Sequence, residues 1–380
     1  MKICGIICEY NPFHAGHEYQ LREAKRLSNA DALLCCMSGN FVQRGEVAIL
    51  EKHVRARHAI LGGADAVIEL PVCFATSSAE IFAKGAIKLL SSIPEITTLC
   101  FGMENADKDE LIKTATLLVN EPKGISEKIQ SLLSQGVSFV KARAEAWKEY
   151  IPAELLTSSN NILAIEYAKA VLTSRARIEL LPIPRIGSRY SEKTLSGKYP
   201  SATAIRSAIQ NRAPLCGIPD YVQNDLPASL KNELETIENY AILNKNVSEI
   251  AQTPDCTEGL EYALKNLVIR GEKNLSEKLT SPRYTTSRLR RILLQNALNI
   301  TKSGIEEYLN SELYLKLLAV KRERSDVLSV LGKAKAPLVV RAHDEDNLTP
   351  HALKCFLLDA FADQLYAQLS PSAQKKELFI

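Results

Sequence analysis

Short apolar runs alternate with helix-like segments over the first half of the chain. The runs that predict strands are residues 2–8, 31–37, 66–70, 97–101 and 178–183. Helical spacing begins at about His17 and continues over residues 52–61, 78–90 and 161–172, with two or three more helices expected between residues 108 and 150. Strands that alternate with helices indicate a parallel sheet covered on both faces. We therefore expect an α/β fold, a Rossmann-like, doubly wound parallel sheet.

The sequence changes in character after about residue 217. Its 380 residues exceed the size at which one hydrophobic core usually stops growing, so two domains are expected. Residues 230–243, 259–270, 287–300 and 305–320 all have helical spacing, and strand signals become few. We predict an α/β domain over residues 1–217 and a mainly α-helical domain over residues 218–380.

Charge and cysteine content exclude several classes of protein. The formal net charge is only +3, so a nucleic-acid partner would have to be held by a local basic patch. The nine cysteines include no CxxC pair, which argues against a zinc ribbon or a thioredoxin-like motif, and free thiols in a reducing cytoplasm are expected. The apolar stretch at the N-terminus is too short for a signal peptide or a membrane span. We expect a cytoplasmic protein that does not contact a membrane.

The most informative motif follows the first predicted strand and leads into the first predicted helix. It reads Glu9-Tyr10-Asn11-Pro12-Phe13-His14-Ala15-Gly16-His17. Open α/β sheets bind ligands at this edge, and a helix N-terminus offers free N–H groups to an anion. Gly16 removes a Cβ where a phosphate would approach, and the histidines can donate hydrogen bonds to phosphate oxygens. A surface pair or half of a metal site remains an alternative, although no further cluster of carboxylates or cysteines stands out.

Two motifs in this order resemble a known superfamily. His14-Ala15-Gly16-His17 looks like the HxGH signature of nucleotidyltransferases and class I aminoacyl-tRNA synthetases. Ser201-Ala202-Thr203-Ala204-Ile205-Arg206 is similar to their second signature, ISSTxIR, with Ala202 in place of a serine. Taken by itself, the second segment also fits a plain helix start with Ser201 as the N-cap.

Longer blocks narrow the resemblance to the bacterial tRNA(Met) cytidine acetate ligase family. They are CEYNPFHAGHEYQL, MSGNFVQRGEVAIL, the ELP of residues 69–71 and SSNNILAIEYAKA, with a thinner similarity through SPRYTTSRLRRILL. The resemblance implies an ATP-dependent ligase that activates acetate as acetyl-adenylate. It further implies transfer of the acetyl group to N4 of the wobble cytidine of elongator tRNA(Met).

The resemblance also implies roles for individual residues. His14 and His17 would donate to the α-phosphate oxygens, whereas Thr203 and Arg206 would hold the β- and γ-phosphates, with Mg²⁺ bound through the phosphates rather than by a protein cage. Gly102 lies at the end of a predicted strand, where backbone can approach the nucleoside. The full expected ATP site is Ile7, Cys8, Glu9, Tyr10, Asn11, Pro12, Phe13, His14, Ala15, Gly16, His17, Gln20, Gly102, Asn161, Arg185 and Ile186.

Roles can also be predicted for three further segments. Residues 37–46 suit a flexible loop over the acetate or the target base, or a plain surface loop. Lys52, Arg55 and Arg57 fit the solvated face of a helix. The basic patch that suits tRNA phosphates and base stacking, rather than only a solvated face, consists of Arg283, Tyr284, Arg288, Arg290 and Arg291.

Other functions stay open at this point. A small-molecule adenylyl- or cytidylyltransferase of cofactor synthesis would share the HxGH motif, although such enzymes are often much shorter. A class I aminoacyl-tRNA synthetase would need a KMSKS-type lysine loop, which is not seen. A non-catalytic nucleotide- and RNA-binding protein is the remaining alternative, and intact His14, His17 and Arg206 argue against it.

Overall fold

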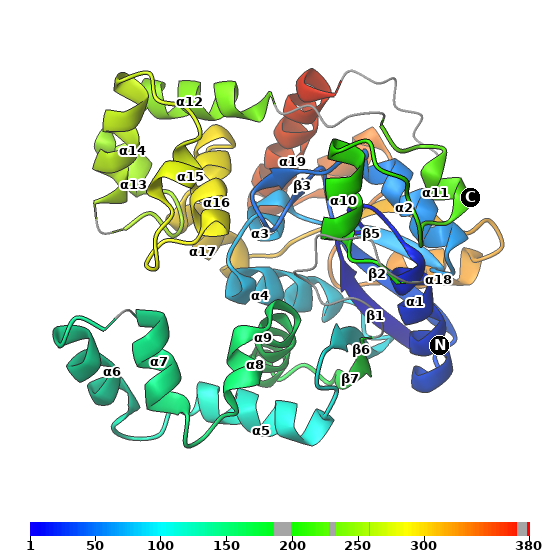
Figure 1. Ribbon diagram of the computed structural model, residues 1–380. Helices are drawn as coiled ribbons and strands as arrows, with labels where there is room; N and C mark the ends of the chain where they lie inside the picture. The colour runs from blue at the N-terminus through cyan, green and yellow to red at the C-terminus, as the bar shows by residue number, and fades with distance from the viewer. Residues whose placement is uncertain (138, 186–198, 228–232, 258, 371–377) are drawn as a thin grey trace.

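The computed structural model describes residues 1–137, 139–185, 199–227, 233–257, 259–370 and 378–380. A seven-stranded sheet in the order β7-β6-β1-β2-β5-β8-β9 forms its centre (Figure 1). The first five of these strands by position are mutually parallel: β7 (Glu179–Pro184), β6 (Ile96–Met103), β1 (Ile3–Cys8), β2 (Ala32–Ser38) and β5 (Ala66–Leu70). The predicted doubly wound α/β sheet is therefore confirmed.

The strand order reverses between β1 and β6. From β1 the chain builds outward through β2 and β5, and it then returns to place β6 and β7 on the other side of β1. In open α/β sheets the crevice at such a reversal, outside the carboxyl ends of the strands, is where ligands bind. The end of β1 leads directly into α1 (Ala15–Ser28), so the HxGH motif lies at this point.

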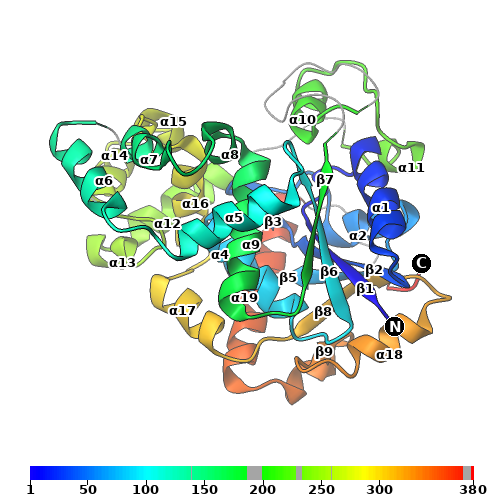
Figure 2. The same ribbon diagram turned by 90° about the horizontal axis from the view of Figure 1, so that it is seen from below.

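Each face of the sheet has its own hydrophobic core. Ile3 and Ile7 of β1 belong to the core on one face, whereas Cys4 and Ile6 belong to the core on the other. This alternation follows from the two-residue repeat of a strand, and nearly continuous apolar strands are what burial on both faces requires. The helices α1 and α2 (Lys52–Leu61) cover one face, and α4 (Ala79–Leu90) and α9 (Ser159–Ser174) cover the other (Figure 2).

Two helical parts extend from the sheet toward the same side of the molecule (Figure 1). One follows β6 and comprises α5 (Lys108–Val119), α6 (Ile125–Ser134), α7 (Phe139–Trp147) and α8 (Ala153–Thr157). The other, here called the helical module, comprises α12 (Leu234–Asn244), α13 (Val247–Ala251), α14 (Leu260–Ile269), α15 (Leu275–Leu279) and α16 (Thr286–Ala297). The module has a core of its own, which includes Ile242, Leu264 and Ile292.

The prediction of one helix over residues 305–320 is wrong. Helix α17 (Lys302–Asn310) ends early, and β8 (Leu315–Val320) joins the sheet antiparallel to β5, followed by β9 (Leu338–Val339). A short apolar run such as this strand cannot be told from a buried helix segment by periodicity alone. After α18 (Ser325–Leu331) and a 3-10 turn (Ala342–Asn347), α19 (Pro350–Leu369) packs on α3 (Val72–Ala75). The C-terminal part of the chain thus returns to the sheet.

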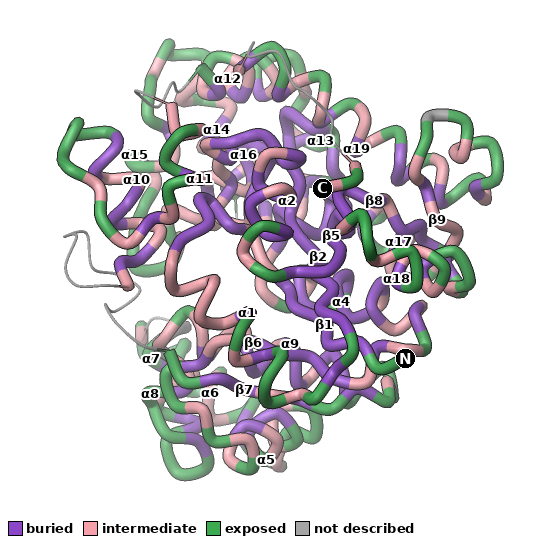
Figure 3. Tube along the Cα trace, turned by 90° about the vertical axis from the view of Figure 1, so that its right-hand side faces the viewer, coloured by how far each residue is buried: buried purple, intermediate pink, exposed green. Residues whose placement is uncertain are grey.

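Burial follows this architecture. The central strands are buried along nearly their whole length, whereas most exposed positions lie on the outer helices and turns (Figure 3). Among the described residues, no helix combines the length and apolar character that crossing a membrane requires.

Buried charges join α19 to the sheet and to α2. The Nζ atom of Lys52 lies 2.8 Å from Oε1 of Glu69 and 2.5 Å from Oδ2 of Asp363 on α19. Lys316 of β8 reaches the same two carboxylates at 3.0 and 3.2 Å. Burial alone would raise the pKa of Glu69, but Lys316 and Lys52 outweigh it and hold that pKa at about 2. Glu69 is therefore ionised and balances both cations.

Replacing Glu69 with glutamine would leave the two lysines with too little negative charge in a buried site. Removing one partner of a buried ion pair costs about 3–5 kcal/mol, so we expect Glu69→Gln to lower the free energy of unfolding by that amount in urea titrations. The matched control is Glu80→Gln, which removes the exposed pair with Lys84 and should cost less than about 1 kcal/mol. Equal losses in the two variants would contradict a structural role for the buried charges.

Candidate active site

The turn between β1 and α1 is organised by its two histidines. His14 is the N-cap of α1, and its Nδ1 accepts a hydrogen bond from the backbone N–H of Gly16 at 3.1 Å. In return, the backbone N–H of His14 donates to Nδ1 of His17 at 3.3 Å. This is a capping box in which histidines replace the usual hydroxyl and carboxylate side chains. A Cβ on Gly16 would lie 2.9 Å from Cε1 of His14, so the glycine leaves room for this ring.

The capping box fixes the tautomer of both rings. A neutral imidazole has one donor nitrogen and one acceptor nitrogen, and in both histidines Nδ1 is the acceptor. The proton must therefore be on Nε2. The rings are stacked with centroids 3.7 Å apart and planes inclined by 19°, so the two Nε2–H donors belong to one compact pair. Tyr10 and Phe13 pack against His17, with ring centroids 4.7 and 5.6 Å from it.

Both histidines are held in the neutral form. Burial, and next the guanidinium groups of Arg185 and Arg206, lower the pKa of His14 to about 3. Burial and the neighbouring His14 lower the pKa of His17 well below its usual value. At neutral pH the site therefore offers two uncharged N–H donors, and its fixed positive charge comes from the two arginines.

The second sequence motif packs directly on the first. Ser201 caps α10 (Ala202–Gln210) by accepting the N–H of Ala204 at 3.0 Å, as expected for a helix start. From the next turn of that helix, Nη1 of Arg206 donates to the carbonyl of Asn11 at 2.8 Å, and Nη2 lies 3.5 Å from Oγ1 of Thr203. The predicted residues Arg206 and Thr203 are thus brought to the HxGH turn from nearly two hundred residues away.

Three other predicted residues meet at the ends of β6 and β7. A Cβ on Gly102 would lie 3.3 Å from Cγ of Arg185, whose backbone N–H donates to the carbonyl of Met103 at 3.1 Å. Asn161 is buried, and its Oδ1 accepts the N–H of Glu104 at 3.0 Å, so this side chain joins α9 to β6. The carboxylate of Glu104 lies 3.9 Å from Nε of Arg185. Ile186 falls outside the described residues.

The remaining predicted ATP residues differ in where their side chains lie. Ile7 packs into the hydrophobic core on the face covered by α4 and α9, whereas Cys8 packs against the core on the opposite face. Gln20 lies half-buried on α1, about one turn beyond His17. The backbone at the end of β1, rather than the side chain of Ile7, is therefore what can line the crevice.

Two charged residues on α2 were wrongly expected on a solvated face. Lys52 and Arg55 are both buried, and only Arg57 is half-exposed, paired with Asp225. Arg55 donates to the carbonyls of Leu50 at 2.9 Å, Glu9 at 2.6 Å and Ser38 at 3.1 Å, and also to that of Gly39. Its partners are backbone atoms, which no side-chain pattern reveals, so the sequence carries no signal for this role.

Residues 37–46 do not form a plain surface loop. They include a short hairpin of β3 (Phe41–Val42) and β4 (Glu46–Val47), and Phe41 and Val42 are buried. The backbone N–H of Gln43 donates to Oε1 of Glu9 at 2.7 Å. Burial raises the pKa of Glu9, against the hydrogen bond from Gln43 and the nearby arginines, which lower it. The hairpin therefore contacts the residue that opens the HxGH turn.

The predicted RNA-binding residues lie on and before α16. Arg283 is exposed, and its guanidinium carbon lies 5.8 Å from the ring centroid of Tyr284, with that of Arg288 at 5.2 Å. Arg288 also donates to the carbonyl of Asp255 at 2.7 Å. Arg290 pairs with Glu46, and Arg291 is largely buried and lies 3.3 Å from the carboxylate of Asp255. The five residues are thus adjacent, and Arg288, Arg290 and Arg291 contact carbonyl or carboxylate groups of the protein itself.

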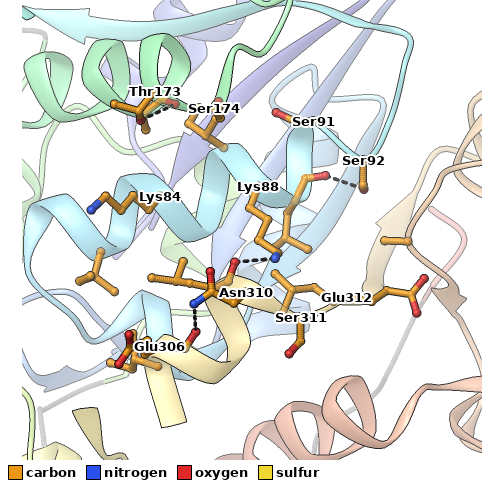
Figure 4. Close-up of a pocket in the computed structure, with 18 of the residues that line it drawn as sticks. Lys84, Lys88, Ser91, Ser92, Thr173, Ser174, Glu306, Asn310, Ser311 and Glu312 are labelled. Atoms are coloured by element: carbon orange, nitrogen blue, oxygen red, sulfur yellow. Dashed lines mark hydrogen bonds between the residues drawn. The ribbon is translucent and has the colours of Figure 1, made fainter. Parts of the chain in front are cut away.

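A cavity of about 1080 Å³ lies along α4 between α9 and α17 (Figure 4). Lys84 and Lys88 line it from α4, and Nζ of Lys88 donates to the carbonyl of Leu309 at 2.6 Å. Of the predicted ATP-binding residues that the structure describes, none lines this cavity. Likewise, no group of three or more His, Cys, Asp or Glu side chains in the described part of the chain is placed to hold a metal ion.

The lowered pKa of His14 has a consequence for stability. Between about pH 3 and 6.5 the unfolded chain binds a proton at this residue and the folded protein does not, so the free energy of unfolding falls as the pH falls. The slope is up to about 1.4 kcal/mol per pH unit for one group. In His14→Asn the cap acceptor is retained but the titration is lost.

We expect wild type to lose roughly 2 kcal/mol more than His14→Asn between pH 7 and pH 5. Urea unfolding of both proteins at the two pH values measures the difference. Carboxylate contributions are common to both, so parallel losses would show that His14 is not held neutral.

Comparisons with known proteins agree with this geometry. The family model described as "HIGH Nucleotidyl Transferase" matches residues 1–378. A tRNA(Met) cytidine acetate ligase of Clostridium perfringens is 35% identical, covering 98% of this chain and 97% of that protein. Apo Thermotoga maritima TmcAL matches with a TM-score of 0.90 at 28% identity over 100% of both chains. The structure of Thermotoga maritima TmcAL bound with alpha-thio ATP matches with a TM-score of 0.85 at 29% identity, over 99% of this chain and 97% of that one. The resemblance predicted from the motifs is confirmed, and the chain belongs to the tRNA(Met) cytidine acetate ligases of the HIGH nucleotidyltransferase family.

Proposed function

We propose that this protein is an ATP-dependent ligase that activates acetate as acetyl-adenylate and acetylates N4 of the wobble cytidine of elongator tRNA(Met). The observation that carries the proposal is the pair of neutral Nε2–H donors of His14 and His17, flanked by Arg185 and Arg206 at a helix N-terminus. Relatives named for this reaction, and a structural relative bound with alpha-thio ATP, support it. We place the enzyme in the cytoplasm, where its tRNA substrate would be available.

The first step joins acetate to AMP. A carboxylate oxygen of acetate attacks the α-phosphorus of ATP in line, and the bond to the β-phosphate oxygen breaks, so pyrophosphate leaves. Negative charge is spread over the non-bridging oxygens in the transition state, and fixed donors aimed at these oxygens lower the barrier. His14 and His17 supply such donors without carrying charge themselves. Mg²⁺ would be held by the phosphates of ATP rather than by protein side chains, and it would neutralise part of their charge.

The arginines are assigned to parts of ATP other than the α-phosphate, which the histidines would contact. Arg206 with Thr203 on α10, and Arg185 beyond β7, bring positive charge to the HxGH turn from two sides. We assign Arg206 and Thr203 to the β- and γ-phosphates, where charge must be neutralised as pyrophosphate departs. Gly102 lets backbone and Arg185 lie close together at the side where the nucleoside would bind.

The second step transfers the acetyl group. The N4 amine of cytidine attacks the carbonyl carbon of acetyl-adenylate, the bond from that carbon to the phosphate oxygen breaks, AMP leaves, and N4 loses one proton. We assign Arg283 and Tyr284 to the RNA contact, because Arg283 is exposed and a tyrosine ring can stack on an unpaired base. Arg288, Arg290 and Arg291 hold internal partners and would act mainly by supporting this surface.

Two substitutions of His14 separate its roles as cap and as donor. Asparagine is a good N-cap and replaces the Nδ1 acceptor, but it has no group at the position of Nε2–H. Glutamine places an amide nitrogen near that position and loses the cap. Loss of one fixed donor costs about 2.7–4 kcal/mol of barrier, so we expect His14→Asn to be folded and roughly 10²–10³-fold slower.

Acetate-dependent ATP–pyrophosphate exchange and labelling of tRNA from [¹⁴C]acetate, with nucleoside analysis, measure both steps. His14→Gln should be less stable than His14→Asn yet retain more exchange activity. Exchange without N4-acetylcytidine in wild type would keep the adenylate chemistry and point to another acceptor. Absence of both reactions in wild type would overturn the proposal.

If Arg283 contacts RNA, substitutions of Arg283 and Arg291 should differ in how they change the salt dependence of tRNA binding. Removing a side chain that binds one phosphate lowers the slope of log affinity against log salt concentration by about 1. We expect Arg283→Gln to weaken tRNA binding and to reduce this slope by that amount. Arg291→Gln, which removes the pair with Asp255, should lower the melting temperature and leave the slope unchanged. Filter binding at several salt concentrations checks this, and an unchanged slope in Arg283→Gln would remove Arg283 from the interface.

A further inference from the structure

The turn of the β3–β4 hairpin lies between the HxGH turn and the helical module. At one end, the backbone N–H of Gln43 donates to Glu9 at 2.7 Å, next to the HxGH turn. Just beyond β4, the N–H of Ile49 donates to Oδ1 of Asn11 at 2.9 Å. Because Arg206 also donates to the carbonyl of Asn11, the hairpin and the second motif hold the same short segment. Residues 9–11 are therefore fixed partly by the hairpin.

At its other end the hairpin packs so closely against α16 that no side chain fits at the contact. Gly45 has a φ of +71°, and a Cβ there would lie 2.4 Å from the backbone nitrogen of Arg291 and 2.5 Å from the carbonyl carbon of Arg290. These are backbone atoms of a helix, which cannot move aside singly. The next residue, Glu46, forms an ion pair with the guanidinium of Arg290. Glycine is thus required both by the backbone conformation and by the contact.

Two backbone hydrogen bonds join the two ends of the turn. Gly45 N–H donates to the carbonyl of Val42 at 2.9 Å, which closes the turn, and Ala48 N–H donates to the carbonyl of Asn40 at 2.9 Å. Gln43 and Gly45 are only two residues apart, so α16 cannot move relative to the sheet without moving the donor to Glu9 or breaking the contact at Gly45. A displacement of the helical module that keeps the contact at Gly45 is therefore transmitted through this turn to residues 9–11.

We propose that Gly45 and Glu46 are positioning residues through which the helical module and the HxGH turn are coupled. RNA bound on the module and ATP bound at the turn then change each other's affinity by the same factor, because such linkage is reciprocal. The inference rests on the proposed function, since it needs both ligands. Neither Gly45 nor Glu46 is proposed to contact ATP or RNA directly.

The coupling is measured as a ratio of dissociation constants. The affinity for alpha-thio ATP is determined by calorimetry with and without saturating tRNA(Met), and couplings of this kind typically lie between about 5- and 150-fold. In wild type we expect a ratio within that range. In Gly45→Ala, where the new methyl group forces the turn away from α16, and in Glu46→Gln, which loses the ion pair, the ratio should fall toward 1.

Controls separate coupling from mere destabilisation. Glu80→Gln removes an exposed ion pair elsewhere and should keep the wild-type ratio. The charge exchange Glu46→Arg with Arg290→Glu should restore the coupling that Glu46→Gln abolishes, which a purely structural defect would not explain. Because Glu46→Gln introduces no steric conflict, it remains informative if Gly45→Ala does not fold.

Three outcomes would overturn the inference. They are a ratio near 1 in wild type that binds both ligands, a wild-type ratio retained in Glu46→Gln, and an equal loss of the ratio in Glu80→Gln. The proposed function fails in a different way, by absence of acetate-dependent exchange and of tRNA acetylation in wild type. The two failures are therefore distinguishable.

Discussion

The arrangement of the crevice depends on the hydrogen bonds that the guanidinium group of Arg55 donates to backbone carbonyls. This group donates to carbonyls at the ends of β1 and β2 and to Leu50 just before its own helix, and it is fully buried. An arginine can satisfy several carbonyls at once because its planar group carries five N–H donors in fixed directions. The carboxyl ends of two adjacent strands are thereby held in one arrangement, and the HxGH turn begins from that arrangement. Burial lowers the pKa of Arg55, but nearby Tyr366, Glu51 and Glu9 favour the charged form.

The histidine pair combines structure and chemistry in the same atoms. The Nδ1 atoms of His14 and His17 close the first turn of α1, and this use leaves Nε2–H as the donor on each ring. A helix start made by serine and glutamate would satisfy the backbone equally well but would bring negative charge and no outward donor. Two histidines at this spacing therefore present two N–H donors in fixed orientations, which is the arrangement that the proposed phosphate contact would use.

Much of the fold and part of the site could be predicted from the sequence. The apolar runs predict the positions of β1, β2 and β5. The HxGH motif indicates where ATP would bind because its histidines act within a few residues of their own backbone, and the partner motif is recognised by its sequence although Arg206 contacts the distant Asn11. Lys52 and Arg55 could not be predicted, since their partners are distant carboxylates and backbone carbonyls that leave no local pattern. The strand β8 was missed because a six-residue run that is apolar except for Lys316 fits a helix as well as a strand. The strands β3 and β4 are too short to show a two-residue repeat.

The return of the chain to the sheet has a consequence for synthesis on the ribosome. Until β8 emerges, β5 is an edge strand with unpaired backbone groups, and until α19 follows, Lys52 and Glu69 lack their partner Asp363, which is 311 residues from Lys52. Contacts between residues this far apart in the sequence form late and slow folding. The sheet that carries the HxGH motif is therefore complete only when nearly the whole polypeptide has been made, and β5 stays an exposed edge for most of translation.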